Sequence, residues 1–180
     1  MAQKCVGIVI GPRKLKAVEL SGSFGEVSLE RYWLIDIPEF FRNMVFGLLP
    51  GSDQELSVPV ELKEIASAES ELCISIPGEL CFYREIEFPF TDLKKINQVI
   101  RLEAEGYFPF SLDEYLLDYL PPLSQDHSSQ VLAFALKRNQ FSQVLSALNT
   151  LGLDPAFSGI EGLSLPLLSI NQPGLPRLWL

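Results

Sequence analysis

The sequence is poor in the residues that bind metals or carry out nucleophilic catalysis. Its 180 residues include one histidine, His127, which lies in a polar stretch, and three cysteines without a Cys-x-x-Cys pair. A metal centre usually needs several such ligands, and a Ser/His/Asp or Cys/His arrangement needs a histidine in the site. We therefore expect neither a metal site nor a catalytic triad. Cys5 and Cys73 adjoin apolar strand residues and are expected to be buried thiols in a reducing compartment.

Long apolar runs and a surplus of basic residues are also missing. No apolar stretch approaches the ~20 residues of a membrane span, and the chain start lacks the pattern of a signal peptide. Lys and Arg number 14 against 23 Asp and Glu, for a net charge of −9. This balance disfavours nucleic acid or an anionic membrane as partner and suits a basic protein, although most acidic cytosolic proteins are simply soluble. We expect a cytoplasmic chain with no membrane span of its own.

What the chain does contain begins with three consecutive β-strands. Alternating apolar residues from Val6 to Ile10 and from Lys16 to Leu20 flank a Gly11–Pro12 turn, and a further alternating run covers residues 26–37. Such alternation between turn residues predicts an antiparallel meander. In the third strand we expect the apolar residues of the pattern to share one face, with Arg31 as the exception: Val27, Leu29, Trp33, Ile35 and Ile37.

Helices and strands follow in turn. The clearest helix begins at a cap on Thr91 or Asp92 and ends at Glu105, because apolar residues recur every three or four positions. A second helix begins at Asn139 and ends at Gly152. The other expected segments are helices at 40–49, 58–67 and 160–169 and strands at 72–76, 82–88, 115–120, 131–136, 155–159 and 178–180. A last strand with neither turn nor cap after it suggests a fragment, cut where a second half begins.

The turn after the first strand looks like a phosphate-binding hairpin without its acid. Glycine lets backbone amides face an anion, so Gly11 and Lys16 are the candidate nucleotide-binding residues. An ATPase of this kind also needs a carboxylate near the turn to hold hydrated Mg²⁺. Positions 8–12 supply none. The sequence therefore predicts a binding scaffold without catalytic residues and without a cofactor, and ATP with Mg²⁺ is the less favoured alternative.

Several motifs share one family resemblance. They are Gly7-Ile-Val-Ile-Gly-Pro12, Leu15-Lys-Ala-Val-Glu-Leu20, Ile74-Ser-Ile-Pro-Gly78, Arg84-Glu-Ile-Glu-Phe-Pro89, Glu103-Ala-Glu-Gly-Tyr-Phe-Pro-Phe110, Asp118-Tyr119 and Gly152-Leu-Asp-Pro155. Together they resemble the actin-like cytoplasmic proteins of type IV pilus assembly (PilM) and the related cytoplasmic part of the type II secretion protein L (GspL). The match covers most of the chain outside residues 39–72. The family's opening has an acid where this chain has Val9 and a serine where it has Pro12.

The resemblance implies a mixed α/β fold, namely the first half of an actin-like ATPase (ribonuclease H-like) structure with a small inserted α+β subdomain. Residues 1–78 and 155–180 would form the core subdomain and residues 80–154 the inserted one. The second half, with the adenine pocket, would lie beyond the chain. Since the first-loop acid is missing, the secretion branch, whose members tolerate a degenerate site, is favoured over the pilus branch.

The resemblance also implies partners. In the pilus family, the inserted subdomain and its junction with the core hold a short cytoplasmic peptide of a bitopic membrane protein. In the secretion family, the cytoplasmic part recruits the N-terminal domain of the secretion ATPase. We therefore expect a non-catalytic scaffold at the cytoplasmic face of the inner membrane that recruits this ATPase and couples it to membrane partners. The alternatives are a PilM-type protein that binds ATP and the tail of a bitopic pilus protein, and an actin-like filament.

The candidate partner-binding residues are aromatic and charged. They are Arg84, Glu103, Tyr107, Phe108 and Phe110, with Tyr115 beside them. Aromatic residues and arginine dominate the binding energy of interfaces when they fill pockets. Phe108 and Phe110 are equally well explained as the core of the inserted subdomain. Glu103 is otherwise a solvated helix end or an ion-pair partner of Arg101 or Arg84.

Overall fold

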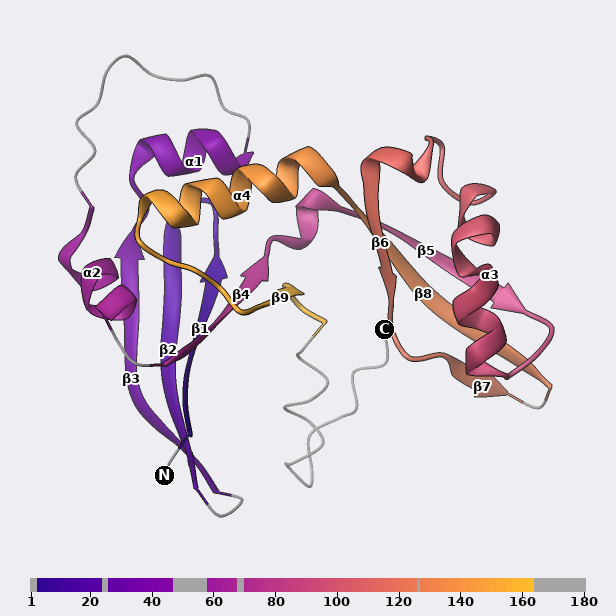
Figure 1. Cartoon of the computed structure of the whole chain (residues 1–180), viewed down its shortest axis with the longest axis horizontal. Helices are drawn as coiled ribbons and strands as arrows, with labels where there is room; N and C mark the ends of the chain where they lie inside the picture. Colours follow the sequence, from indigo (N-terminus) through magenta and orange to yellow (C-terminus); the bar gives the residue numbers. More distant parts are fainter. Residues whose placement is uncertain (1–2, 24–25, 47–57, 68–69, 126, 164–180) are drawn as a thin grey trace. The chain divides into compact units, whose positions relative to one another are not determined.

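The chain divides into two compact units, each with its own β-sheet. The computed structural model describes residues 3–23, 26–46, 58–67, 70–125 and 127–163 (Figure 1). One unit contains Met1–Gly78 and the chain from Gln143 onward, and the other contains Glu79–Ser142. The first boundary lies within two residues of the one expected from the sequence. The second lies inside the helix α4 (Arg138–Thr150), whereas the sequence-based division placed this whole helix in the inserted segment.

The first unit is built on a five-stranded mixed sheet in the order β3-β2-β1-β4-β9. The predicted meander forms its antiparallel half, and the other two strands run parallel to β1. The strands are β1 (Gln3–Ile10), β2 (Lys14–Ser23), β3 (Glu26–Asp36), β4 (Glu71–Ile76) and β9 (Phe157–Ile160). The helices that belong wholly or mostly to this unit are α1 (Glu39–Phe46), α2 (Val60–Ser67) and α4.

The two faces of this sheet differ in burial. The core face carries Val6, Ile8, Ile10, Leu15, Ala17, Ile35, Leu72, Ile74 and Ile76, each at most 9% exposed. The unit's helices also bury apolar residues, such as Phe41 of α1, Leu62 of α2 and Leu148 of α4. The opposite face, which we call the open face, carries exposed apolar side chains. Val18, Leu34 and Phe157 on it are 38%, 59% and 59% exposed.

A β-bulge in β3 corrects the expected alternation of that strand. Arg31 lies opposite Glu19 of β2, but Leu29 lies opposite the very next residue, Leu20, so that Glu30 is an extra residue. An extra residue shifts the side-chain alternation by one position. Ile35 therefore faces the core, whereas Leu29 belongs to the open face. The prediction that the apolar residues of this strand share one face is wrong.

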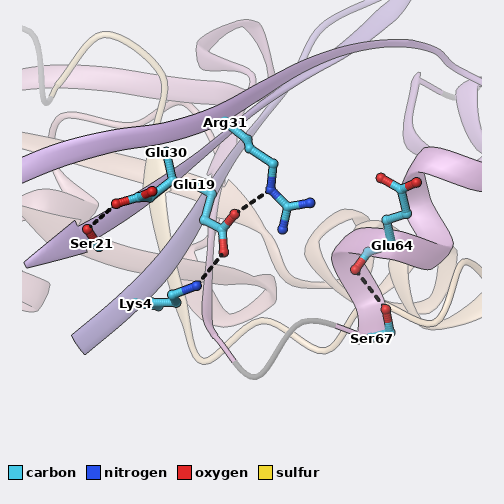
Figure 2. Close-up of polar contacts among 7 residues, drawn as sticks. All are labelled: Lys4, Glu19, Ser21, Glu30, Arg31, Glu64 and Ser67. Atoms are coloured by element: carbon cyan, nitrogen blue, oxygen red, sulfur yellow. Dashed lines mark hydrogen bonds and ion pairs between the residues drawn. The ribbon is translucent and has the colours of Figure 1, made fainter. Parts of the chain in front are cut away.

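An ion-pair network lies beside the bulge on the core face. Glu19 is 2% exposed and accepts a hydrogen bond of 2.7 Å from Nε of Arg31, and Nζ of Lys4 lies 3.7 Å from its other oxygen (Figure 2). The hydrogen bond from Arg31 holds the pKa of Glu19 below its usual range, although burial acts in the opposite direction. Glu30 accepts a hydrogen bond from the Ser21 hydroxyl at 2.5 Å. These contacts tie β3 to its neighbours in the bulged register.

The second unit packs one helix, α3 (Leu93–Glu105), on an antiparallel sheet in the order β5-β8-β6. The strands are β5 (Cys81–Phe88), β6 (Tyr115–Tyr119) and β8 (Ser128–Lys137). A short β7 (Leu123–Gln125) pairs with the first residues of β8. The carboxylate of Asp92 caps α3 by accepting a hydrogen bond from the amide of Lys94 at 2.9 Å. The core joins Ile96, Ile100 and Ala104 of the helix to Ile86 and Val131 of the sheet.

Most segments occur where the sequence predicts them. Asp92 is the cap of α3, as expected, but α4 begins at Arg138, so Asn139 lies inside it. The short strand β7 is not foreseen. The expected helix at 160–169 lies outside the described residues from 164 on, and the strand at 178–180 lies wholly outside them. None of the described helices is long and apolar enough to span a bilayer.

Candidate functional site

The predicted anchor residues gather at one end of the second unit. Tyr107, Phe108 and Phe110 follow the end of α3, where Gly106 donates to the carbonyl of Glu103 at 3.0 Å. Arg84 lies on the central part of β5, and Tyr115 begins β6. Each of these strands pairs with β8, so they flank it from opposite sides. Residues far apart in sequence are therefore held by one rigid sheet.

Four rings form what we call the aromatic cluster: Phe82, Phe108, Phe110 and Tyr115. Phe110 is its centre, because it stacks on Tyr115 with ring centroids 4.1 Å apart and meets the edge of Phe82 at 4.8 Å. Phe108 lies 5.5 Å from Phe110. Offset-stacked and edge-to-face pairs of this kind each add about 0.5–1.5 kcal/mol beyond burial, so the cluster is a stiff surface rather than a set of independent side chains.

The cluster is buried at one end and exposed at the other. Phe108 is 5% exposed and belongs to the core of the unit, so it is not available as an anchor. Phe110 and Tyr115 are half-buried, whereas Phe82 is 44% exposed and Tyr107, beside the cluster, is 43% exposed. The alternative explanation, that these aromatics pack the unit's own core, holds for Phe108 and in part for Phe110. The accessible apolar surface is carried by Phe82 and Tyr107.

Arg84 is held in place over this surface. Its Nε donates to the carbonyl of Tyr107 at 3.0 Å, its Nη1 donates to the carbonyl of Tyr83 at 2.7 Å, and the guanidinium lies 5.8 Å from the Phe108 ring centroid. Both bonds are to carbonyls, and among the described residues Arg84 forms no ion pair with a carboxylate. A fixed guanidinium beside exposed aromatic rings is suited to bind an acidic or carbonyl-rich peptide segment.

Glu103 does not join the cluster. It is exposed on α3 next to the buried Ala104, and among the described residues it forms no ion pair with Arg101 or Arg84, which was one of the two alternatives. Arg101 instead donates to the carbonyl of Leu112 at 2.9 Å and lies 3.6 Å from the Asp113 carboxylate. The solvated helix end is therefore the alternative that fits.

Phe82 is a residue that the sequence analysis missed. It lies opposite Ala135 of β8, which in turn lies opposite Leu117 of β6, so all three share the face that packs on α3. The alternation Phe82, Arg84, Ile86, Phe88 carries this signal, since every second residue of a strand points to the same face. On this face Ile86 and Phe88 are buried, whereas Phe82 at the other end of β5 is exposed.

A backbone hydrogen bond within the turn closes the loop between β1 and β2. The amide of Gly11 donates to the carbonyl of Lys14 at 3.0 Å, and a Cβ on Gly11 would lie 2.9 Å from that oxygen, so glycine is required for the turn itself. Lys14 pairs with Asp36 at 3.1 Å. Lys16, opposite Val9, is exposed on the open face. The amide that a phosphate would need is thus already used, and Gly11 and Lys16 are not held together around an anion.

All three cysteines are free thiols. Cys81 is buried, whereas Cys5 and Cys73, which were expected to be buried, are half-buried and lie on the open face. Burial raises the pKa of the Cys73 and Cys81 thiols. Neither is therefore an activated nucleophile.

Comparison with known proteins gives a structural likeness and no sequence match. No protein-family model matches the chain, and no curated protein matches it. Among solved structures, the chain is similar to one in a PilM–PilN type IV pilus biogenesis complex, with a TM-score of 0.66 and 24% identity over 92% of this chain and 50% of that one. The two chains share a fold.

A second solved structure supports the same conclusion. The cytoplasmic domain of EpsL, an inner membrane component of the type II secretion system of Vibrio cholerae, matches with a TM-score of 0.56 and 9% identity, over 96% of this chain and 61% of that one. Both neighbours come from assemblies of the kinds that the motifs indicated, and the mixed α/β fold class is confirmed. The chain spans 50% and 61% of the lengths of these two proteins.

Proposed function

We propose that the chain is part of a non-catalytic scaffold in a type II secretion or type IV pilus assembly machine, at the cytoplasmic face of the inner membrane. The observation that carries the proposal is the likeness to PilM over 92% of the chain, in a protein solved together with PilN. The likeness to EpsL, described as an inner membrane component of a secretion system, supports the same setting. In this role the chain recruits the N-terminal domain of the assembly ATPase and couples it to a bitopic membrane protein.

The aromatic cluster and Arg84 form the proposed docking surface. Phe82 and Tyr107 offer accessible apolar area, and Arg84 is fixed beside them by two carbonyls. Interfaces obtain most of their free energy from a few such residues, and aromatic and arginine side chains are the commonest. A partner segment with an apolar side chain next to a carboxylate fits this arrangement.

A PilM-type role that includes ATP binding is the second candidate, and the geometry of the first turn disfavours it. A phosphate loop needs free backbone donors and a route to Mg²⁺. Here the Gly11 amide donates to Lys14, Pro12 has no N–H, and Val9 stands where the family has its acid. We propose that the chain binds no nucleotide and catalyses no phosphoryl transfer.

Calorimetric titration tests this proposal directly. The 180-residue chain is titrated with the N-terminal domain of the cognate assembly ATPase, with the cytoplasmic tail peptide of the bitopic partner, and with Mg·ATP. We expect saturable binding of the ATPase domain or the tail and no heat from Mg·ATP. Arg84→Ala should weaken partner binding by about tenfold or more, because an anchor at the centre of an interface is worth about 2 kcal/mol.

A matched control separates this surface from a general loss of structure. Leu102→Ala removes an apolar side chain that is 71% exposed on α3 in the same unit, and should leave the affinity unchanged. Saturable heat from Mg·ATP, together with no binding heat from either protein partner, would overturn the scaffold proposal. Binding that survives Arg84→Ala and Phe82→Ala would keep the function and reject the docking surface.

A further inference from the structure

The strand β3 is an edge with an unusual apolar surface. In the described part of the chain it hydrogen-bonds to β2 on one side and to no strand on the other. Over its length it exposes large apolar side chains to solvent: Val27 at 71%, Leu29 at 61%, Tyr32 at 77% and Leu34 at 59%. Proteins normally protect such edges with charges, proline or short strands, because a long apolar edge pairs with other chains. An edge of this kind therefore calls for a partner.

The bulge places these four side chains on the same face. Tyr32 lies opposite Val18 and Leu29 lies opposite Leu20, and both β2 residues belong to the open face. Glu30 and Arg31, the two residues at the bulge, reach the other face, where they contact Ser21 and Glu19 (Figure 2). A bulged strand commonly places two successive side chains on one side in this way. The apolar stripe is thus continuous across the bulge.

The order of residues along the strand is self-complementary. From Val27 to Leu34 the chain reads apolar, polar, apolar, acid, base, apolar, aromatic, apolar. When this segment is laid antiparallel to a copy of itself, with the two-fold axis between Glu30 and Arg31, Leu29 lies opposite Tyr32 of the second copy and Val27 lies opposite Leu34. Glu30 then faces Arg31 of the second copy on the other face.

We propose that β3 pairs antiparallel with β3 of a second copy of this chain, in this one register. The interface is isologous, as a two-fold dimer requires, because every contact occurs twice. The two five-stranded sheets become one continuous sheet, and the apolar stripes of the two copies join on the open face. Cross-strand apolar pairs and opposite charges are the contacts that stabilise antiparallel strands.

Charge favours this register over the two registers that are shifted by one residue. Sliding the second copy by one residue in either direction places Glu30 opposite Glu30, or Arg31 opposite Arg31. It also places apolar residues of the open face of one copy opposite polar residues of the other copy that point to the core face. Directly opposed like charges destabilise a strand pair, and a one-residue slip reverses the faces. A partner of unrelated sequence would not be specified in this way, so the second copy is the occupant to which the pattern is matched.

Disulfide trapping tests both the pairing and the register. In a background with Cys5 and Cys73 replaced by serine, single variants Leu29→Cys and Tyr32→Cys are prepared. Directly opposite residues have Cα atoms about 4.5–5.5 Å apart, within the range of a disulfide. We expect a cross-linked dimer when the two variants are mixed and oxidised. Each variant alone should stay uncross-linked, because its two cysteines would be three residues apart in register, roughly 10 Å.

Sedimentation equilibrium of the unmodified chain gives the second readout. We expect a concentration-dependent dimer whose dissociation constant rises about tenfold or more in Leu29→Lys and in Glu30→Lys. The matched control is Val60→Lys on α2, which is 64% exposed in the same unit and should leave dimerisation unchanged. All three positions are on the surface, and circular dichroism checks that the variants fold.

Three results would overturn the proposal. They are a chain that stays monomeric at its highest soluble concentration, a cross-link in Leu29→Cys alone, or a dimer that Leu29→Lys leaves intact. The inference is independent of the docking surface on the second unit. Arg84→Ala should therefore weaken partner binding and leave the dimer unaffected, so the two proposals fail separately.

Discussion

Glu19 is a carboxylate that stays ionised although its side chain is almost fully buried. It is held by Arg31, which also lies 5.1 Å above the ring of Trp33, and by Lys4. Taking a carboxylate out of water is costly unless it is paired and hydrogen-bonded, and here both conditions are met. Removing one partner of such a group is more damaging than removing the whole network, since the remaining charge keeps its cost of desolvation.

Glu19→Gln should make the stability of the first unit less dependent on pH. The pKa of Glu19 is lowered from its ordinary value of 4.5, so the unfolded chain takes up the proton first. The stabilisation is fully present above pH 4.5 and is lost as the pH falls through the lowered value in the folded state. Urea unfolding at neutral and acidic pH should therefore show a deficit for Glu19→Gln at pH 7 that shrinks in acid.

The control for this prediction is an exposed carboxylate that forms no ion pair with the described residues. Glu61→Gln removes an exposed carboxylate at the start of α2 and should shift the unfolding midpoint little at any pH. A deficit of the same size at pH 7 and at pH 3 would mean that Glu19 acts through packing rather than charge.

At the scale of elements, α4 ends in a motif that demands glycine. Gly152 has φ +77°, its amide donates to the carbonyl of Asn149 at 2.9 Å, and the amide of Leu153 donates to Leu148 at 3.0 Å. This pair of bonds is the Schellman motif, and the buried Leu153 supplies its apolar contact. The sequence predicts this end correctly, because a glycine after a run of amphipathic residues is a local signal.

Gly152→Ala should destabilise the first unit by about 1–2 kcal/mol, which is the cost of a left-handed conformation for a residue with a Cβ. Space is not the obstacle, because the new Cβ would lie 3.6 Å from Cβ of Ala66. Denaturant unfolding measures the change. Gly159→Ala in β9 is the matched control, since nothing lies within 4 Å of its added Cβ and its φ is unstrained. Equal losses in both variants would contradict the backbone explanation.

Features that depend on contacts between residues far apart in the sequence are harder to predict. The bulge in β3 depends on the pairing of Glu19 with Arg31, twelve positions apart, and nothing local marks Glu30 as the extra residue. The same limit applies to the candidate site. The motif around Tyr107 indicated the place, but only the pairing of β5 with β8 brings Phe82 to the cluster. Phe108 and Tyr107 are neighbours in sequence, and only packing decides that one is core and the other surface.

At the scale of the whole molecule, the two units have separate sheets, and the second unit has a core cluster made of its own residues. The core cluster of the second unit draws its residues from β5, α3, β8 and the segment around Leu112, all within Glu79–Ser142. None of the described strand pairs joins the two sheets. A defect in one core should therefore lower the stability of its own unit first, because local unfolding follows the boundaries of cooperative units.

Ile96→Ala tests this independence. Ile96 is fully buried on α3, so its truncation should cost about 2–5 kcal/mol through lost burial and the cavity left behind. Hydrogen exchange read by mass spectrometry should then speed up in peptides from α3, β5 and β8 and stay unchanged in peptides from β1 and β2. Leu102→Ala, exposed on the same helix, should alter neither set. Faster exchange in both sheets would mean that the units unfold as one, and a partner bound at Arg84 could then influence the edge strand β3 through stability alone.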